Sequence, residues 1–516
     1  MSQTVQRPQE PASDDVRPLP SHVRFAIVGT GFAGLGMAIK LKQRGIEDFV
    51  LLEHAGDVGG TWRDNQYPGC QCDVPSNLYS FSFAPNPDWS RTFAPQPEIW
   101  AYLRRVADEH RLRPHVRFHA GLTGAAWDAD RDLWAIETQR GSLTADVLVA
   151  GTGALHEPSI PRLPGIENFA GRTFHSAQWD HDRDLRGRRV AVVGTGASAI
   201  QFVPKIQPQV GQLTLFQRTP PWIMPHSGRP VRPRERALFR RIPAIQRLVR
   251  GAVYWGREVY VLPFLHPAFS RIPQIAARRH LANQVPDERL RAKLTPDYAI
   301  GCKRILISND YYPALCQSNV EVVTGGIRRV ERDAIVTEDG ARHEVDTIIF
   351  GTGFRVTDMP IGELVRGRDG RTLAETWDGS PQALRGTTVA GFPNLFLLVG
   401  PNTGLGHTSI VFMIESQLRY LLGCLDAMER RGAAVVEPRA KAQAAFNAGV
   451  QEAMRGTVWT SGGCASWYLD RSGRNTTLWP GTSWGFRGAT RHFDEKEYDL
   501  RPRLGAPIPA AAVAPG

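Results

Sequence analysis

The sequence predicts an α/β fold with two dinucleotide-binding domains, because two glycine-rich turns each follow a short apolar strand. The first turn, residues 29–34, follows the apolar residues 25–28, and the second, residues 194–199, follows residues 190–193. The order strand, turn, helix is that of a Rossmann-like domain, where the backbone approaches a pyrophosphate at the helix start. Two such turns indicate two dinucleotides. The residues that shape them are Gly29, Gly31 and Gly34 in the first turn and Gly194, Thr195, Gly196 and Ser198 in the second.

The first domain also has the acidic residue that such a site uses. A helix is expected over residues 35–44 and a second strand over residues 49–52, which ends at Glu53, 24 positions after Gly29. A carboxylate at this point can accept hydrogen bonds from both ribose hydroxyls of a dinucleotide. Strand, turn, helix, strand and acid in this order predict dinucleotide binding more strongly than the glycines alone do.

In the second domain, the equivalent strand is followed by a basic residue instead of an acidic one. Residues 213–216 form that strand, and Gln217, Arg218 and Thr219 follow it. Arg218 lies 24 positions after Gly194, in the register of Glu53 after Gly29. An arginine there can pair with the additional phosphate of NADP, so NADP is the predicted second dinucleotide.

The chain crosses between the two domains at two places. Residues 146–149 and 347–350 are apolar strands, closed by Gly151 and Gly153 and by Gly351 and Gly353. A further strand, residues 395–399, leads into a glycine-rich segment that contains Asn402 and suits approach to the first dinucleotide.

Residues 226–299 differ from both domains. They are rich in arginine, with helical apolar spacing and prolines as punctuation, which predicts a helical insertion. Residues 253–265 are also consistent with a basic amphipathic helix on a membrane surface. We favour a helical subdomain that lines a substrate entrance.

The bulk composition limits the partners. The chain has 516 residues, 42% of them hydrophobic, and a net charge of +11. Arginines are spread along the chain without a nucleic-acid recognition motif, so we attribute the charge to anionic cofactors and expect no nucleic-acid partner. No apolar run is long enough to span a bilayer and the first residues lack the apolar core of a secretion signal, which favours the cytoplasm.

The six cysteines form no C-x-x-C pair, which argues against a metal site and against a dithiol oxidoreductase. We therefore expect reduced, unpaired thiols.

Two motifs add a resemblance to a known family. Between the glycine turns, Phe169, Gly171, His175 and Trp179 follow the pattern F-x-G-x-x-x-H-x-x-x-W-D, and the stretch that begins at residue 59 and ends at Asp73 follows [AG]-G-x-W-x4-[FY]-P-[GM]-x3-D. Both resemble signatures of type I Baeyer-Villiger monooxygenases, and the resemblance spans about residues 22–490 by motif order. Without the match to these motifs, Phe169, Gly171, His175 and Trp179 would be interpreted as a packed linker. Asp73 would be interpreted as a turn cap.

The resemblance implies the chemistry. FAD and NADPH would be bound, and one oxygen atom of O2 would be inserted next to the carbonyl of a small ketone through a peroxyflavin, giving an ester or lactone. Arg304 would be the active-site arginine, oriented by Asp73, and Lys303 a second partner for the phosphate of NADP. The fingerprint stretch that holds His175 would be a hinge. Thr61 and Trp62 would belong to the flavin site, and Trp467 would pack on the nicotinamide cofactor.

Two alternatives remain open at this point. A related flavin-containing monooxygenase oxidises nitrogen or sulfur atoms of soft nucleophiles, although that family usually has Tyr or Phe at the position of Trp179. A non-catalytic basic protein with a nucleotide fold is the more distant alternative. The expected organisation is a flexible leader (1–20), a FAD-binding domain in two parts (21–158 and 355–503), an NADP-binding domain (159–225 and 300–354), the helical insertion (226–299) and a flexible tail (504–516).

Overall fold

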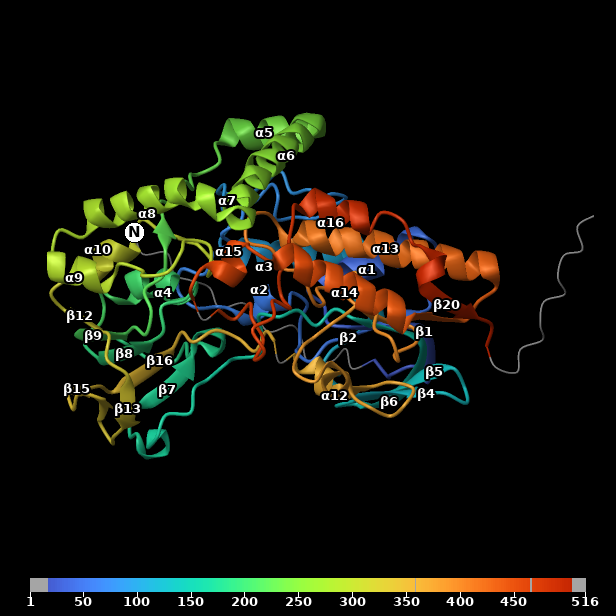
Figure 1. Ribbon diagram of the computed structural model, residues 1–516, viewed down its shortest axis with the longest axis horizontal. Coiled ribbons are helices and arrows are strands. Elements are labelled where there is room, and N and C mark those ends of the chain that lie inside the picture. Colours follow the sequence, from blue (N-terminus) through green and yellow to red (C-terminus); the bar gives the residue numbers. More distant parts are fainter. Residues whose placement is uncertain (1–16, 358, 465, 504–516) are drawn as a thin grey trace, which may run out of the picture.

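The protein consists of two lobes, each built on its own sheet (Figure 1). The computed structural model describes residues 17–357, 359–464 and 466–503, so most of the expected leader and the whole expected tail lie outside the described residues. Residues of the first sheet come from both ends of the chain, and residues of the second come from its middle. The predicted fold class, two dinucleotide-binding α/β domains with a helical insertion, is confirmed.

The first lobe contains an eight-stranded sheet in the order β17-β4-β5-β6-β1-β2-β3, with β18 also paired to β6. The strands β6, β1, β2 and β3 run parallel, whereas β4, β5 and β6 form an antiparallel meander. All four residues of β2 are buried, as expected for a central parallel strand covered on both faces. The strands are β1 (His22–Val28), β2 (Phe49–Leu52), β3 (Val116–Arg117), β4 (Leu122–Asp128), β5 (Leu133–Thr138), β6 (Gly141–Ala150), β17 (Val365–Arg366) and β18 (Leu395–Leu397).

Helices α1 and α13 pack together beside this sheet. The Cβ of a residue replacing Gly36 would lie 3.0 Å from Leu418, so the two helices approach closely there. α13 begins at a capping Ser409, whose hydroxyl accepts from the Val411 amide, and ends at Gly432 with a φ of +59°. The helices of this lobe are α1 (Phe32–Gln43), α2 (Thr61–Asp64), α3 (Gln96–Glu109), α11 (Ile361–Leu364), α12 (Leu373–Trp377), α13 (Ile410–Arg431), α14 (Ala440–Met454), α15 (Val458–Ser461) and α16 (Ser483–Ala489); β19 (Val435–Pro438) pairs with β20 (Tyr498–Arg501).

The second lobe contains a five-stranded parallel sheet in the order β12-β9-β8-β16-β7. A small antiparallel sheet, β13-β14-β15, lies at its side. The elements are β7 (Arg172–His175), β8 (Arg189–Val193), α4 (Ala199–Ile206), β9 (Gln212–Phe216), α10 (Tyr311–Leu315), β12 (Val320–Val323), β13 (Ile327–Val330), β14 (Ala334–Thr337), β15 (Arg342–Glu344) and β16 (Thr347–Phe350).

The two connections between the lobes run side by side. Pro158 and Phe354 form an antiparallel bridge, the Ser159 amide donates to Gly353 O at 2.9 Å, and the Arg355 amide donates to Glu157 O at 3.0 Å. The predicted crossing points therefore form one two-stranded connection.

The helical insertion is bracketed by a pairing of β10 (Ile223–Met224) with β11 (Leu306–Ile307). Its helices are α5 (Pro233–Arg241), α6 (Pro243–Glu258), α7 (Leu262–Leu265), α8 (Arg271–Gln284) and α9 (Glu288–Lys293). Most of its helices lie along one side of the molecule: α5, α6 and α8 are uppermost in Figure 1, and α9 lies below them at the left edge. Of the helices in the described ranges, none combines the length and apolar character needed to cross a bilayer.

A disulfide joins Cys302 to Cys464, with their Cα atoms 6.2 Å apart. The prediction of unpaired thiols is therefore wrong for these two residues. The physical reason is a tertiary contact that the sequence spacing does not reveal. The Ala299 amide donates to Gly462 O at 3.0 Å and brings together segments whose cysteines are 162 positions apart.

Candidate active site

A cavity of about 1290 Å³ is lined by both glycine turns and by both crossing segments. It extends between the carboxyl ends of the parallel strands of the two lobes, where open α/β sheets bind their ligands. Most of the predicted site residues line it: Gly29, Gly31, Glu53, Thr61, Trp62, Asp73, Gly194, Thr195, Gly196, Ser198, Arg218, Thr219, Lys303, Arg304 and Trp467.

The first glycine turn fits a dinucleotide because it has no room for side chains. Gly29 has a φ of +94°, and a Cβ there would lie 2.7 Å from Gly151 O. A Cβ on Gly34 would lie 1.8 Å from Gly29 O, which holds the start of α1 against the turn. The amides at the start of α1 are therefore open to an anionic group in the cavity.

Glu53 is buried at the end of β2 and is held ionised. It accepts hydrogen bonds from the Thr30 hydroxyl at 2.5 Å and from the Ala55 amide at 3.0 Å, and Arg63 Nη1 lies 2.8 Å from Oε1. Burial alone would raise the pKa of this carboxyl, but the hydrogen bond from His54 and the charge of Arg63 outweigh it, and the pKa falls to about 2. A fixed carboxylate at this position suits the ribose hydroxyls of a dinucleotide.

The second turn has the same construction but a different charge. Gly194 has a φ of +105°, and a Cβ there would lie 2.5 Å from Gly351 O. The Thr195 hydroxyl donates to Thr219 O at 3.1 Å and ties the turn to the end of β9. The opening therefore has the shape for a pyrophosphate, bordered by Arg218.

Arg218 and Lys303 form a cationic pair at this end of the cavity. Burial and the charge of Arg218 lower the pKa of Lys303, whose Nζ lies 5.0 Å from the centre of the Tyr298 ring. In the described ranges, neither side chain has an acidic partner within 4 Å. The charge of Asp297 acts on Lys303 in the opposite direction but does not outweigh these effects. Two neighbouring cations with no carboxylate in direct contact fit a phosphate ligand.

Arg304 and Asp73 form a fork-shaped ion pair at the centre of the site. Arg304 donates from Nε to Oδ2 at 2.8 Å and from Nη2 to Oδ1 at 2.7 Å and to Oδ2 at 2.6 Å. Burial opposes ionisation of Asp73, but the charge of Arg304 outweighs burial and lowers its pKa. The charge of Asp73 in turn raises the pKa of Arg304. Both side chains therefore stay charged.

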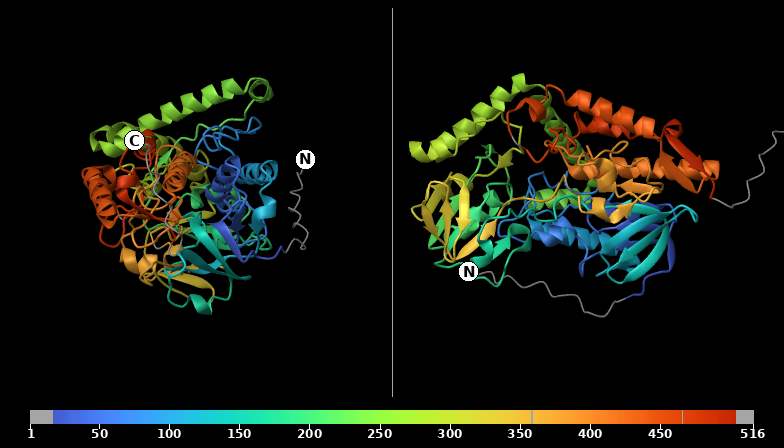
Figure 2. Two further views of the ribbon diagram at one scale, coloured as in Figure 1. Left: turned by 90° about the vertical axis from the view of Figure 1, so that its right-hand side faces the viewer. Right: turned by 60° about the horizontal axis from the view of Figure 1, so that its bottom comes forward.

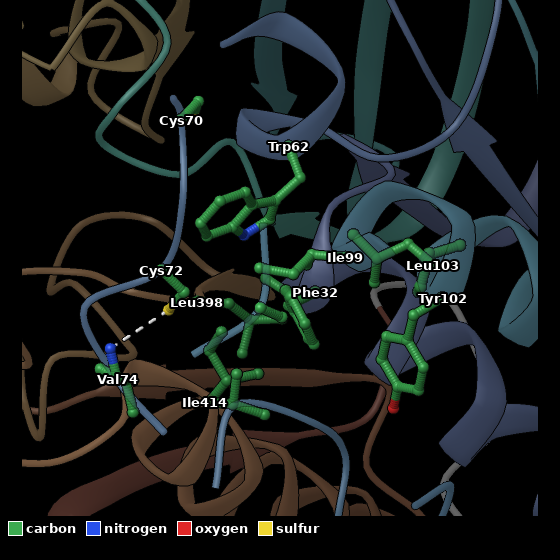
Figure 3. Packing of buried hydrophobic residues seen from close by; sticks show 14 of the residues in the cluster. Phe32, Trp62, Cys70, Cys72, Val74, Ile99, Tyr102, Leu103, Leu398 and Ile414 are labelled. Atoms are coloured by element: carbon green, nitrogen blue, oxygen red, sulfur yellow. Dashed lines mark hydrogen bonds between the residues drawn. The ribbon is translucent and has the colours of Figure 1, made fainter. Parts of the chain in front are cut away.

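The backbone around Asp73 explains its direction. Cys72 and Val74 on either side are buried in the core beside Trp62, and the Val74 amide donates to Cys72 Sγ at 3.4 Å (Figure 3). Because the neighbours on both sides of Asp73 are buried in the core, its carboxylate is left facing the cavity.

Arg257 is a second cation near this pair that the sequence did not reveal. It lies on α6 and donates from Nε to His407 O at 3.0 Å. Burial lowers its pKa and the charge of Asp73 opposes this effect. The insertion therefore contributes a charge to the site, and no local pattern in residues 226–299 distinguishes this arginine from its neighbours.

The fingerprint residues lie at the edge of the second lobe, against the crossing segment. His175 ends β7, accepts from the Ala177 amide through Nδ1 at 3.1 Å, and has its ring 5.7 Å from that of Phe354. Burial lowers its pKa to about 4, so the ring is neutral at physiological pH. Trp179 packs on Phe202, with ring centres 5.3 Å apart.

Glycine is required at position 171, since a Cβ there would lie 2.3 Å from Asp346 O and 2.6 Å from the Phe169 ring.

Two further predicted residues differ in how they are held. Asn402, with a φ of +55°, donates from its amide to Asn475 O at 2.8 Å and Leu478 O at 2.9 Å, so its side chain braces two loops. Trp467 is 43% exposed, and its ring centre lies 4.4 Å from that of Tyr468. It is an exposed aromatic surface at the cavity.

Comparison with known proteins agrees with this geometry. Residues 22–363 match the family described as flavin-binding monooxygenase-like. The chain is 56% identical over 496 residues to a Baeyer-Villiger monooxygenase of Streptomyces coelicolor, covering 96% of this chain and 95% of that one. It is 52% identical over 482 residues to a Baeyer-Villiger monooxygenase of Pseudomonas aeruginosa, covering 93% and 92%.

Among solved structures, an oxidised steroid monooxygenase bound to NADP superimposes with a TM-score of 0.83 at 30% identity, covering 94% of this chain and all of that one. The match therefore extends over both lobes and over the insertion between them. The chain belongs to the flavin-binding monooxygenases and, within them, to the Baeyer-Villiger monooxygenases.

Proposed function

We propose that the chain oxidises a small-molecule ketone with NADPH and O2 to an ester or lactone, with Arg304 and Asp73 as its catalytic pair. The observation that carries the proposal is the fork-shaped contact between these two side chains in a cavity bordered by two dinucleotide turns. We also place the enzyme in the cytoplasm, where NADPH is available.

The residues divide into two binding sets. The turn with Gly29, Gly31 and Gly34, together with Glu53, would hold FAD, and Thr61 and Trp62 would border it. Asn402 would support the flavin site through the loop that its side chain braces. The turn with Gly194 and Gly196, together with Thr219, would hold NADPH, with Arg218 and Lys303 on its additional phosphate and Trp467 at its nicotinamide end. When bound, the reduced flavin supplies the reaction of oxygen with the ketone.

Arg304 contributes a positive charge that does not depend on pH. A guanidinium stays protonated throughout the working range, and its planar fork keeps a fixed direction when a carboxylate holds it. Negative charge that develops on the substrate's carbonyl oxygen would be stabilised by such a preorganised donor. Asp73 positions Arg304, and Arg257 adds to the positive potential around the pair.

The test is product analysis with the purified flavoprotein. NADPH consumption is measured with linear, cyclic, aryl and steroid ketones and with a thioether, and products are identified by mass. Ester or lactone formed in proportion to NADPH supports the proposal. Sulfoxide formation with no ester from any ketone would replace it by the heteroatom-oxidising activity.

A further inference from the structure

The helical insertion carries nearly all of the protein's excess charge. Residues 226–299 contain fifteen Lys and Arg against five Asp and Glu, a net charge of +10 in a chain whose total is +11. The rest of the chain is therefore close to neutral, and the excess charge does not lie in the two dinucleotide-binding lobes, contrary to our attribution of it to anionic cofactors. The positive potential of the molecule originates on one side, where α5, α6 and α8 lie (Figures 1 and 2).

The same helices also expose apolar side chains. Of the fourteen large apolar side chains that are exposed among the described residues, ten belong to residues 238–275. Soluble proteins rarely gather exposed apolar groups in this way unless the surface contacts something. We call these ten residues the insertion face: Leu238, Ile242, Leu248, Trp255, Val259, Tyr260, Leu262, Phe269, Ile272 and Ile275.

Helix α6 is amphipathic, but its apolar face is turned outward, whereas a surface helix normally turns its polar face to water. Its outward side chains include Leu248, 74% exposed, and Trp255, 59% exposed, and the spacing of seven positions puts them on one face. Two of its polar side chains, those of Gln246 and Arg250, point into the protein. Gln246 Nε2 donates to Asn86 O at 2.7 Å, and Arg250 Nη1 donates to Asn77 O at 2.7 Å.

Helix α8 repeats this arrangement and adds charge. Ile272 and Ile275 are exposed on it at 73% and 58%, whereas Ala277 and Leu281 are buried. Arg271 and Arg279 are exposed beside the two isoleucines. Apolar groups bordered by arginines are the pattern of a helix that lies in the interface of an anionic bilayer.

We infer that the insertion face docks on the surface of a membrane that contains anionic lipid. Charge complementarity selects this partner. A second copy of the chain would bring a second face with a net charge of +10 against the first, and the two would repel. Nucleic acid would suit the arginines but would leave aliphatic side chains such as Leu248 and Ile272 in water. An anionic bilayer takes both the charge and the apolar groups. This inference does not depend on the reaction that the enzyme catalyses.

The experiment uses the full-length flavoprotein and flotation with lipid vesicles. One set of vesicles is phosphatidylcholine alone, and the other contains about one third phosphatidylglycerol. Salt is varied between about 0.05 and about 0.5 M, because surface attraction is screened over this range. We expect the protein to float with the anionic vesicles at low salt, at least about tenfold more than with neutral ones, and to be released partly at high salt.

Two variants separate the apolar and the electrostatic contributions. Trp255→Ser with Ile272→Ser removes apolar contacts, and Arg241→Gln with Arg279→Gln removes charge. The charge variant is expected to weaken vesicle binding roughly tenfold or more, since each basic residue near the surface raises the affinity about fivefold. The apolar variant is expected to weaken binding by a similar factor, because two apolar side chains no longer enter the interface. The matched control is Ile160→Ser, an equally apolar residue that is 51% exposed outside the insertion, and it is expected to bind vesicles as the parent does.

Bound flavin and light scattering show that each variant is folded and report its oligomeric state. Equal flotation of the parent with neutral and anionic vesicles, or none with either, overturns the inference. Loss of a parent dimer in the Trp255→Ser, Ile272→Ser variant without any lipid binding would assign the face to contact between copies instead.

Discussion

Arg304 and Asp73, which are 231 positions apart in the sequence, meet through three hydrogen bonds of 2.6, 2.7 and 2.8 Å. The contact joins the two lobes, because Asp73 belongs to the loop after α2 and Arg304 follows the insertion. A movement of one lobe against the other therefore changes the position of the guanidinium relative to the first dinucleotide site.

Replacing Arg304 is expected to separate the two half-reactions. Loss of a preorganised donor typically costs about 2.7 to 4 kcal/mol, or roughly two to three orders of magnitude in rate. Arg304→Ala should therefore lose detectable ester, and Arg304→Lys should be severely impaired because the fork is lost. In both variants, anaerobic NADPH should still bleach the flavin, and stopped-flow absorbance measures this step. Ester formation by Arg304→Ala at near the parent rate would assign the role to another cation, with Arg257 the first to be tried.

Arg218→Ala is expected to weaken the binding of NADPH and to leave the binding of NADH almost unchanged. A charge-assisted phosphate contact contributes about 1.5 to 3 kcal/mol, so the KM for NADPH should rise roughly tenfold or more. Arg186→Ala is the control, because that side chain is 78% exposed and pairs with Asp184. Equal losses for both nucleotides would remove Arg218 from the phosphate site.

Trp179→Ala and His175→Ala should keep FAD and slow oxygenation. Their contacts are with Phe202 and Phe354, in the second lobe and the crossing segment, and not with the first glycine turn. Since the pKa of His175 is about 4, His175→Gln should leave the pH profile of activity between about pH 6 and 8 unchanged. Protein purified without flavin would mean that these residues serve packing alone.

Glu53 should make flavin retention depend on acidity. Its pKa in the folded protein is about 2, below the ordinary 4.5, so its stabilising effect is complete above about pH 4.5 and is lost as the pH falls toward 2. The shift corresponds to roughly 3 kcal/mol. In Glu53→Gln, the temperature of flavin release should be lower at pH 7, and the difference from the parent should shrink below about pH 4.5 and vanish only as the pH approaches 2. Parallel curves for the two proteins over this range would contradict the role of the carboxylate.

The predictable part of the fold is the part that is local in sequence. The turns at Gly29 and Gly194 each have a strand before them and a helix after them, and the structure places β1, α1, β8 and α4 there. The meeting of Arg304 with Asp73 was expected only through the resemblance of the motifs, since no periodicity connects residues so far apart.

The features that were missed depend on tertiary contact. Arg257 reaches the site only because of the way α6 crosses the loop at His407, and its neighbours Arg250 and Arg247 have the same local sequence character. Cys302 and Cys464 pair because the backbones of residues 299 and 462 are hydrogen-bonded. Neither relationship produces a sequence spacing from which it could be predicted.

The paired connection at Pro158 and Phe354 restricts how the lobes move. Because two backbone hydrogen bonds join the connecting segments, one on each side of the bridge, neither segment can swing without the other. We therefore expect rotation of the second lobe to follow a single axis, so that the nicotinamide end of the cavity is carried along an arc instead of being free in all directions. A rotation of this kind repeats the same alignment in every turnover, and the alignment of the two dinucleotide sites then rests on two backbone hydrogen bonds between the crossing segments that line the cavity.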